Sequence, residues 1–285
     1  MVQARTQSTR LPGKVLLPIE GRPMLERMLA RLGRARALDE LVVATTCLEV
    51  DRPITAVAAG LGLRWVAGHP TDLIERHAEA ARLAAADAVV KIPSDCPLVD
   101  PAIVDQVVGV FREGAGRYDY VSNLHPASWP DGNDVEVFRV DALQLADRLA
   151  DLPHEREHTT PFLWDQPERF RLGNVTWGQG RDLSGSHRLT VDHREDFEVV
   201  SAVWAALAPR HGDAFSVGEI VAFLDANPAL RAHNAHHRNT GWPADHAALL
   251  RTRGGAHPLG LAAGAGPTAG AATTTGVTTA PRVGT

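Results

Sequence analysis

The sequence predicts an α/β fold with a mostly parallel sheet that is flanked by helices. Over the first two hundred residues, short apolar runs alternate with longer amphipathic stretches, which is the rhythm of repeated βα units. Pro23, Pro53 and Pro101 fall near the starts of three of these stretches, where the missing N–H of proline costs little. Ligands of such sheets bind beyond the carboxyl ends of the strands, so polar residues that follow a strand are the first candidates for a site.

The first part of the chain contains three compact apolar runs that end at polar or turn residues, as short buried strands do. These predicted strands are 41–45, 63–66 and 88–92. The stretches between and after them have helical periodicity. The predicted helices lie near 23–35, 51–61, 72–85 and 101–113.

After residue 118 the pattern becomes less regular. Further strands are predicted at 118–122, 134–138, 170–175 and 188–191, and helices at 141–150, 156–164, 195–208 and 217–226. From about residue 253 the composition collapses to Gly, Ala, Thr and Pro, with almost no large side chains to bury, so we expect disorder. We therefore divide the chain into a main domain (1–210), a small helical extension (211–252) and a disordered tail (253–285).

The bulk composition excludes several classes of protein. The 285 residues carry a net charge of −5, which gives no compositional support for nucleic-acid binding. Cys47 and Cys96 are far apart and match no metal or redox spacing, so a disulfide framework is not expected. No apolar run approaches the roughly 20 residues of a membrane span, and the N-terminus has no apolar signal core. We expect a soluble cytoplasmic protein that does not bind membranes.

Basic residues concentrate in the loop at 3–14, directly after a short apolar start. Arg5, Arg10 and Lys14 are spaced so that successive cations reach different phosphates, and Ser8 adds a hydroxyl. Gly13 lets the backbone come close to a ligand. The loop therefore suits a triphosphate, although it lacks the spacing of a Walker P-loop. The alternative is an ordinary solvated basic loop.

Two aspartates follow predicted strands and are candidates for a magnesium site. Asp95 comes after the strand at 88–92, and Asp192 directly follows the strand at 188–191. Mg²⁺ takes one or two carboxylates together with waters and phosphate oxygens. The alternative for both residues is a capping or turn aspartate before a helix.

Three further residues are candidates for contact with a substrate. Asp134 and Glu136 share one face of a predicted strand, and paired carboxylates of this kind suit a hydroxyl-rich ligand or a metal. His158 is placed to contact a substrate carboxylate, or else belongs to a salt-bridged surface turn. The histidines at 233, 236 and 237 match no zinc pattern, and a solvated stretch is the favoured interpretation.

Five motifs that occur in order resemble the cytidylyltransferases of the CMP-KDO synthetase class, above all their spore-coat-polysaccharide SpsF-type branch. They are Q-A-R-x-x-S-T-R-L-P-G-K at 3–14, G-D-C-P-L-x-D-P at 94–101 with Ser94 for the glycine, P-D-G-x-D-V-E-V-F at 130–138, R-E-H-x-T-P at 156–161 and R-x-T-V-D-x-x-E-D-F at 188–197. Weaker matches lie at 21–25, 42–46 and 238–242. The resemblance spans roughly residues 1–245.

The resemblance implies a Rossmann-like nucleotidyltransferase fold, related to that of family-A glycosyltransferases. The implied reaction is Mg²⁺-dependent transfer of CMP from CTP to a sugar or sugar-acid hydroxyl, with release of pyrophosphate, in surface-polysaccharide or specialised glycan biosynthesis. The residues it assigns to the nucleotide are Ala4, Arg5, Ser8, Arg10, Gly13, Lys14, Thr45 and Thr46. It assigns Asp95 and Asp192 to Mg²⁺, catalysis to Arg10, Lys14 and Asp95, and leaves Asp134, Glu136 and His158 for the acceptor.

Several alternatives stay open at this point. One alternative is a nucleotidyltransferase that uses another nucleotide or a sugar phosphate. Another is a non-catalytic homologue that binds nucleotide or glycan. The resemblance also suggests a homodimer. About four or five apolar residues precede Q-A-R in the family, whereas only Met1 and Val2 do so here. We therefore expect the natural start to lie upstream.

Overall fold

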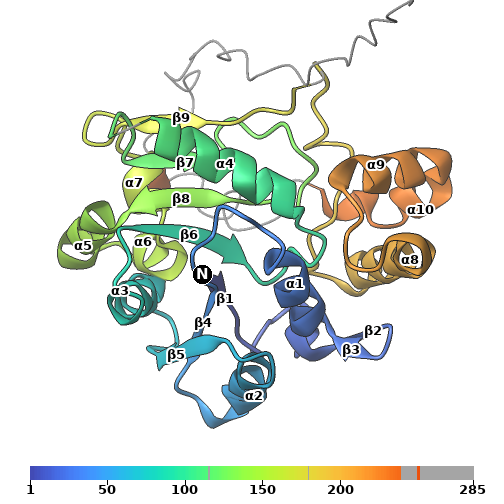
Figure 1. The fold of residues 1–285 in the computed structure, drawn as a ribbon, viewed down its shortest axis with the longest axis horizontal. Helices are drawn as coiled ribbons and strands as arrows, with labels where there is room; N and C mark the ends of the chain where they lie inside the picture. The colour runs from blue at the N-terminus through green and yellow to red at the C-terminus, as the bar shows by residue number, and fades with distance from the viewer. Residues whose placement is uncertain (115, 179, 239–248, 251–285) are drawn as a thin grey trace, which may run out of the picture.

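The structure is a computed structural model that describes residues 1–114, 116–178, 180–238 and 249–250. Its centre is a seven-stranded sheet with the strand order β5-β4-β1-β6-β8-β7-β9 (Figure 1). These strands are β1 (Val2–Gln3), β4 (Val42–Thr46), β5 (Arg64–Gly68), β6 (Ala88–Pro93), β7 (Tyr120–Ser122), β8 (Glu136–Arg139) and β9 (Leu172–Asn174). A separate antiparallel pair consists of β2 (Pro18–Ile19) and β3 (Arg22–Pro23).

Helices cover both faces of the sheet (Figure 1). The α-helices are α1 (Met24–Leu32), α2 (Arg52–Gly60), α3 (Leu73–Leu83), α4 (Pro101–Glu113), α5 (Val140–Leu149), α6 (Pro153–His158), α7 (Pro161–Trp164), α8 (Arg194–His211), α9 (Val217–Ala226) and α10 (Pro228–His233). Short 3-10 turns are η1 (Lys14–Leu16), η2 (Glu49–Asp51) and η3 (Ala235–His237). The predicted α/β class with a mostly parallel sheet is confirmed, because β5, β4, β1 and β6 run parallel and β8 is antiparallel to both its neighbours.

Alternation along the strands divides the core into two parts, one on each face of the sheet. Val43 belongs to the same core cluster as residues of α1, α4 and α8, whereas its neighbours Val42 and Ala44 belong to the cluster that contains residues of α3 and α5. In β8, Val137 and Phe138 divide in the same way. This is the period-2 pattern of strands that are buried on both faces.

The central strands end at one edge of the sheet, and the site loops leave from there. In β1, Val2 pairs with Val43 of β4 and Ile92 of β6, so the chain that follows Gln3 emerges between these two strands. The segment after β6 carries Asp95 to the same edge. Parallel pairing thus brings the basic loop and the first predicted metal ligand together, although about ninety positions separate them.

Two sequence predictions are corrected by the structure. Residues 188–191 do not form a strand: Arg188 makes one isolated bridge with Asp131, and Val191 N donates to Asp95 O at 2.8 Å. The segment is tied to two loops and has no continuous strand to pair with. The helix predicted over 156–164 is two short helices, α6 and α7, because Thr159 has a φ of 68° and Pro161 starts a new helix.

Part of the predicted C-terminal organisation lies outside the described residues. The motif at 239–242 and the tail at 253–285 are in this category, and the division of the chain into domains stays a prediction. None of the helices within the described ranges combines the length and the apolar character that a membrane crossing needs.

Gly132 fixes the distance between two loops that form the site. Its φ of 96° lies in the left-handed region, and a Cβ there would lie 2.4 Å from Thr190 N and 2.5 Å from Leu189 C. Leu189 N donates to Asp131 O at 2.7 Å, so the two backbones are in direct contact. Only glycine allows this approach.

We expect Gly132→Ala to lower the free energy of unfolding by about 3 kcal/mol or more, because backbone strain and overpacking add. Gly116→Ala is the matched control, since Gly116 has a φ of 81° but nothing within 4 Å of its added Cβ. Gly116→Ala should lower the free energy of unfolding only by the strain of a left-handed backbone, which is about 1–2 kcal/mol. Urea denaturation measures both values, and equal losses would contradict the proposed role of the loop contact.

Candidate functional site

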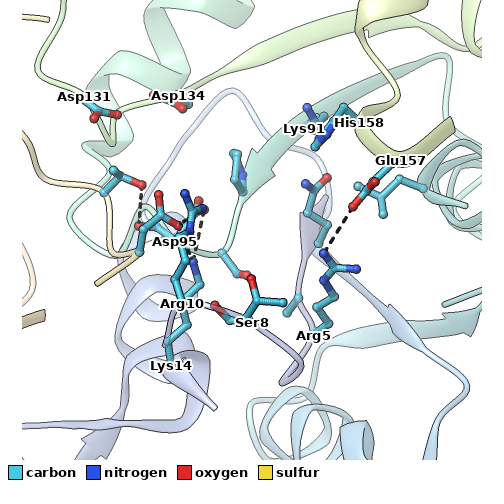
Figure 2. A pocket seen from close by; sticks show the side chains of 18 of the residues that line it. Arg5, Ser8, Arg10, Lys14, Lys91, Asp95, Asp131, Asp134, Glu157 and His158 are labelled. Carbon is cyan, nitrogen blue, oxygen red and sulfur yellow. Dashed lines mark hydrogen bonds and ion pairs between the residues drawn. The ribbon is translucent and has the colours of Figure 1, made fainter. Parts of the chain in front are cut away.

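A cavity of about 440 Å³ opens at the carboxyl edge of the sheet, which is in the size range of small-molecule sites (Figure 2). It brings together most of the residues that the sequence predicted for a site. Those that line it are Ala4, Arg5, Ser8, Arg10, Lys14, Asp95, Asp134, His158 and Asp192.

A buried carboxylate holds the loop after β1 in place through hydrogen bonds. Asp51 Oδ1 accepts from Thr6 N at 2.7 Å and from Thr6 Oγ1 at 2.6 Å, and its other oxygen accepts from the hydroxyl of Thr46. Gly13 closes the loop with a φ of 69° and donates its N–H to Thr6 O at 2.8 Å. Gly13 thus shapes the loop, but does not line the cavity.

Two cations of this loop meet two carboxylates at the cavity wall. Lys14 Nζ lies 3.0 Å from Asp192 Oδ1 and 3.5 Å from Asp95 Oδ2, and donates to Val191 O at 2.6 Å. Arg10 Nη2 lies 2.7 Å from Asp192 Oδ1. Figure 2 shows Arg10 and Lys14 on the same side of the cavity as Asp95. Burial opposes the charge of Lys14, but the two carboxylates outweigh it and raise its pKa.

A buried arginine holds the carboxylates in place from behind. Arg188 Nε lies 2.8 Å from Asp196 Oδ1, its Nη1 lies 3.0 Å from Asp131 Oδ2, and its Nη2 lies 3.2 Å from Asp192 Oδ2. Burial by itself would raise the pKa of Asp192, but Lys14, Arg10 and Arg188 together bring it below the usual value. Asp192 is therefore an ionised, fixed anion at neutral pH.

Two more aspartates extend this wall of the cavity. Burial raises the pKa of Asp131 to about 6 against the attraction of Arg188. Burial and the nearby Asp131 and Asp95 raise the pKa of Asp134 well above its usual value. Asp134 lies before β8 and not within it, so it faces the cavity while Glu136 does not.

Besides Gly13, three residues predicted for the site lie outside the cavity lining. Glu136 is buried and accepts from Lys91 Nζ at 2.6 Å and from Tyr120 Oη at 2.7 Å, so its carboxylate is bound within the protein. Thr45 is fully buried, and the Thr46 hydroxyl belongs to Asp51. The pattern in the sequence places these three residues on or next to strands, but it does not predict the side chains that bury them.

The opposite side of the cavity contains Arg5, Glu157 and His158 (Figure 2). Arg5 Nη2 lies 3.5 Å from Glu157 Oε1, and both side chains are about two-fifths exposed, so water weakens this pair. Arg5 is therefore held far less firmly than Lys14, and it is accessible to a ligand.

The histidine-rich stretch lies apart from this lining. The ligand atoms of His236, His237 and Glu195 are all within 4.8 Å of one another, and the ring of His193 stacks on that of His237 at 3.7 Å. His233 Nε2 lies 2.8 Å from Glu198 Oε2. The expected solvated character holds for His236, which is exposed.

Asp95 and Asp192 have the chemistry that a magnesium ion requires. Both carboxylates contact one ammonium group, Lys14 Nζ, so oxygens from two separate loops face a single point. They also open onto a cavity that is wide enough for phosphate oxygens and waters, which complete the coordination that Mg²⁺ prefers. The donor set therefore fits the ion.

Sequence reasoning missed four residues with important places here. Asp131 and Arg188 stand inside recognised motifs, so closer reading of those motifs would have found them. Asp51 and Arg76 carry no local signal, because a charged residue at the start or in the middle of a helix is usually solvated. Their burial follows from packing between segments that are distant in sequence.

Comparisons with known proteins identify the family of this chain. A family model described as Cytidylyltransferase matches residues 1–208. An uncharacterized protein of Methanocaldococcus jannaschii is 32% identical over 244 residues, which cover 85% of this chain and 96% of that protein. The spore coat polysaccharide biosynthesis protein SpsF of Bacillus subtilis is 27% identical over 233 residues, covering 80% and 94%. A cytidylyltransferase structure from Leptospira borgpetersenii superposes with a TM-score of 0.76 at 31% identity, covering 85% and 96%.

We expect Arg188→Met to lower the free energy of unfolding by about 3–5 kcal/mol at pH 7, because it leaves buried carboxylates without their cation. Arg188 outweighs the burial of Asp196 and holds its pKa below the usual value, whereas Lys14, Arg10 and Arg188 together do the same for Asp192. The contribution of Arg188 through Asp192 and Asp196 is therefore fully present above about pH 4 and is lost as the pH falls further, whereas the part through Asp131 is already lost as the pH falls through about 6.

Denaturant titrations from pH 7 to pH 3 measure this gap between the parent and the variant. Arg194→Met is the control, because its partner Glu198 is exposed and the pair contributes at most about 1 kcal/mol. A gap for Arg188→Met that stays constant down to pH 3 would contradict the assigned role.

Proposed function

The chain belongs to the cytidylyltransferase family and is a nucleotidyltransferase, and from this premise we propose that it transfers CMP from CTP to a sugar or sugar-acid hydroxyl. Pyrophosphate is the second product, Mg²⁺ is the cofactor, and surface-polysaccharide or specialised glycan biosynthesis is the setting. One observation carries the proposal. Lys14 and Arg10 meet Asp192 and Asp95 in a single open cavity.

This arrangement is suited to a magnesium–triphosphate complex because each charged side chain that loses its present ion pair would gain a contact to the ligand. The cations now satisfy the carboxylates, and phosphate oxygens would satisfy the cations once the carboxylates hold the metal. The cavity then receives a polyanion without leaving any of its buried charges unpaired, which would otherwise be costly. Ser8 and the backbone of Ala4 line the same path and add polar contacts.

The reaction forms a bond between the acceptor oxygen and the α-phosphorus and breaks the bond from the α-phosphorus to the bridging oxygen of pyrophosphate. Negative charge therefore grows on the leaving group. Arg10 and Lys14 belong to the same loop. They are placed to stabilise this charge more in the transition state than in the ground state. Lys14 is nearly buried and fixed by three contacts, so little reorganisation accompanies its action.

The metal would be held by Asp95 and Asp192. When bound, Mg²⁺ supplies charge neutralisation at the phosphates and orients them for in-line displacement. Lys14, Arg10 and Arg188 keep Asp192 ionised, and Arg188 holds it in position for this task from behind. We assign Asp134 and His158 to the acceptor, because both line the same cavity as Asp95 and Asp192.

The proposed reaction predicts pyrophosphate release that depends on CTP, an acceptor and Mg²⁺ together. A screen of four nucleoside triphosphates against a panel of sugar acids and neutral sugars measures it. We expect CTP to give the highest rate and EDTA to abolish it. Release with a different nucleotide would replace CTP in the proposal, and no release with any pair would favour a non-catalytic binding protein.

Asp95→Asn should lower kcat by about a hundredfold or more and raise the Mg²⁺ concentration needed for half-maximal rate, because it removes a metal-holding charge. Its thermal unfolding should change little, since the Asp95 side chain is about one-third exposed. Asp39→Asn is the control, because the Asp39 side chain is 92% exposed and its only described partner is Arg112. Unchanged Mg²⁺ dependence in Asp95→Asn would contradict the metal assignment.

A further inference from the structure

A group of metal-binding side chains lies outside the cavity, where the proposed reaction does not use it. The ligand atoms of Glu195, His236 and His237 are all within 4.8 Å of one another. Glu195 belongs to the first turn of α8, whereas the two histidines belong to η3, which follows α10. Two segments that are distant in sequence therefore bring a carboxylate and two imidazoles to one place.

The turn that carries the two histidines is anchored before any ion binds. Asn234 directly precedes η3 and is 1% exposed. Its Nδ2 donates to Asp196 Oδ1 at 2.9 Å and to Arg188 O at 3.1 Å. Because Asp196 is the next residue after Glu195, these bonds hold η3 against the same turn of α8. Less conformational entropy is then lost when the histidines bind an ion.

The ring of His237 is held by its neighbours. Its Nε2 lies 3.2 Å from Glu195 Oε2, and the ring of His193 stacks on it with the centroids 3.7 Å and the planes 4° apart. The centroid of the His236 ring lies 3.9 Å from that of His237. A hydrogen bond from its own backbone N–H and the contact with His237 lower the pKa of Glu195. An ionised carboxylate therefore lies beside two closely packed imidazoles at neutral pH.

The distances in this cluster suit a zinc ion. Two imidazoles and one carboxylate are a known set of three protein ligands for zinc, with water in the fourth position. Zn²⁺ at about 2.0–2.2 Å from each ligand atom holds these atoms about 3.4 Å apart. Glu195 Oε2 and His237 Nε2 already have nearly this separation, and His236 is exposed, so its side chain is able to rotate by the remaining distance. Mg²⁺ prefers oxygen ligands, so the two sites select different ions.

We propose that Glu195, His236 and His237 form a second metal site, which binds one Zn²⁺ ion and leaves the fourth position to water. The ion joins η3 to the start of α8, directly after Asp192. It thereby strengthens the attachment of α9 and α10, which lie together with α8 at one side of the sheet (Figure 1). The inference depends neither on CTP nor on the proposed reaction.

A neighbouring ion pair provides the matched control. His233 Nε2 lies 2.8 Å from Glu198 Oε2, and this pair belongs to no group of three close ligands among the residues that the structure describes. Zinc sites in proteins use three or four protein ligands, so one imidazole and one carboxylate hold the ion much more weakly. His233→Gln therefore removes a histidine from the same stretch and leaves the proposed ligands in place.

The experiment is a calorimetric titration of the full chain, without an affinity tag, with Zn²⁺ in an excess of Mg²⁺ that occupies Asp95 and Asp192. We expect one Zn²⁺ per chain and a melting temperature that rises with the Zn²⁺ concentration. Glu195→Gln and His236→Gln should each weaken Zn²⁺ binding by about tenfold or more. His233→Gln and Asp95→Asn should bind the ion within about twofold of the parent, because neither removes a proposed ligand.

Three results would overturn the inference. They are a parent protein that binds no Zn²⁺ in an excess of Mg²⁺, parental affinity in both Glu195→Gln and His236→Gln, and an equal loss of affinity in His233→Gln. The melting temperatures of the metal-free variants show that a loss of binding is not a loss of folding. Both should match the parent, because glutamine has nearly the shape of glutamate and the His236 side chain is exposed.

Discussion

The site depends on one buried guanidinium. Arg188 contacts Asp131, Asp192 and Asp196, which belong to a loop before β8, to the segment before α8 and to the first turn of α8 itself. No strand joins these segments, because the bridge between Asp131 and Arg188 is isolated. The ion-pair cluster therefore adds to the few backbone hydrogen bonds between these segments, and it fixes the position of Asp192 relative to the basic loop.

Charged groups around the cavity fall into two classes with different consequences. Lys14 and Arg188 are buried and paired, so they hold the site together and, with Arg10, keep Asp192 ionised. Arg76 is buried, and its Nε and Nη2 have no hydrogen-bond partner among the described residues, whereas Arg5 has a weak, exposed partner. The first class accounts for the architecture of the site and, in the proposed reaction, for contact with the phosphates.

Much of this organisation is predictable from local patterns. The strand at 88–92 and the helix at 101–113 come from apolar periodicity and a proline, and they place Asp95 correctly. The strand predicted at 188–191 is wrong, because four residues of strand-like composition do not reveal whether a partner strand exists. The burial of Glu136 beneath Lys91, and that of Arg76 beside Gly68, are tertiary effects between elements that are far apart in sequence, so no local pattern contains them.

The most direct test of the account is a crystal structure with CTP and Mn²⁺, in which anomalous scattering locates the metal. The account predicts a manganese peak bound by Asp95 and Asp192, with Lys14 and Arg10 on the phosphates. A structure without a metal at Asp95 and Asp192, with the triphosphate remote from Lys14, would contradict it.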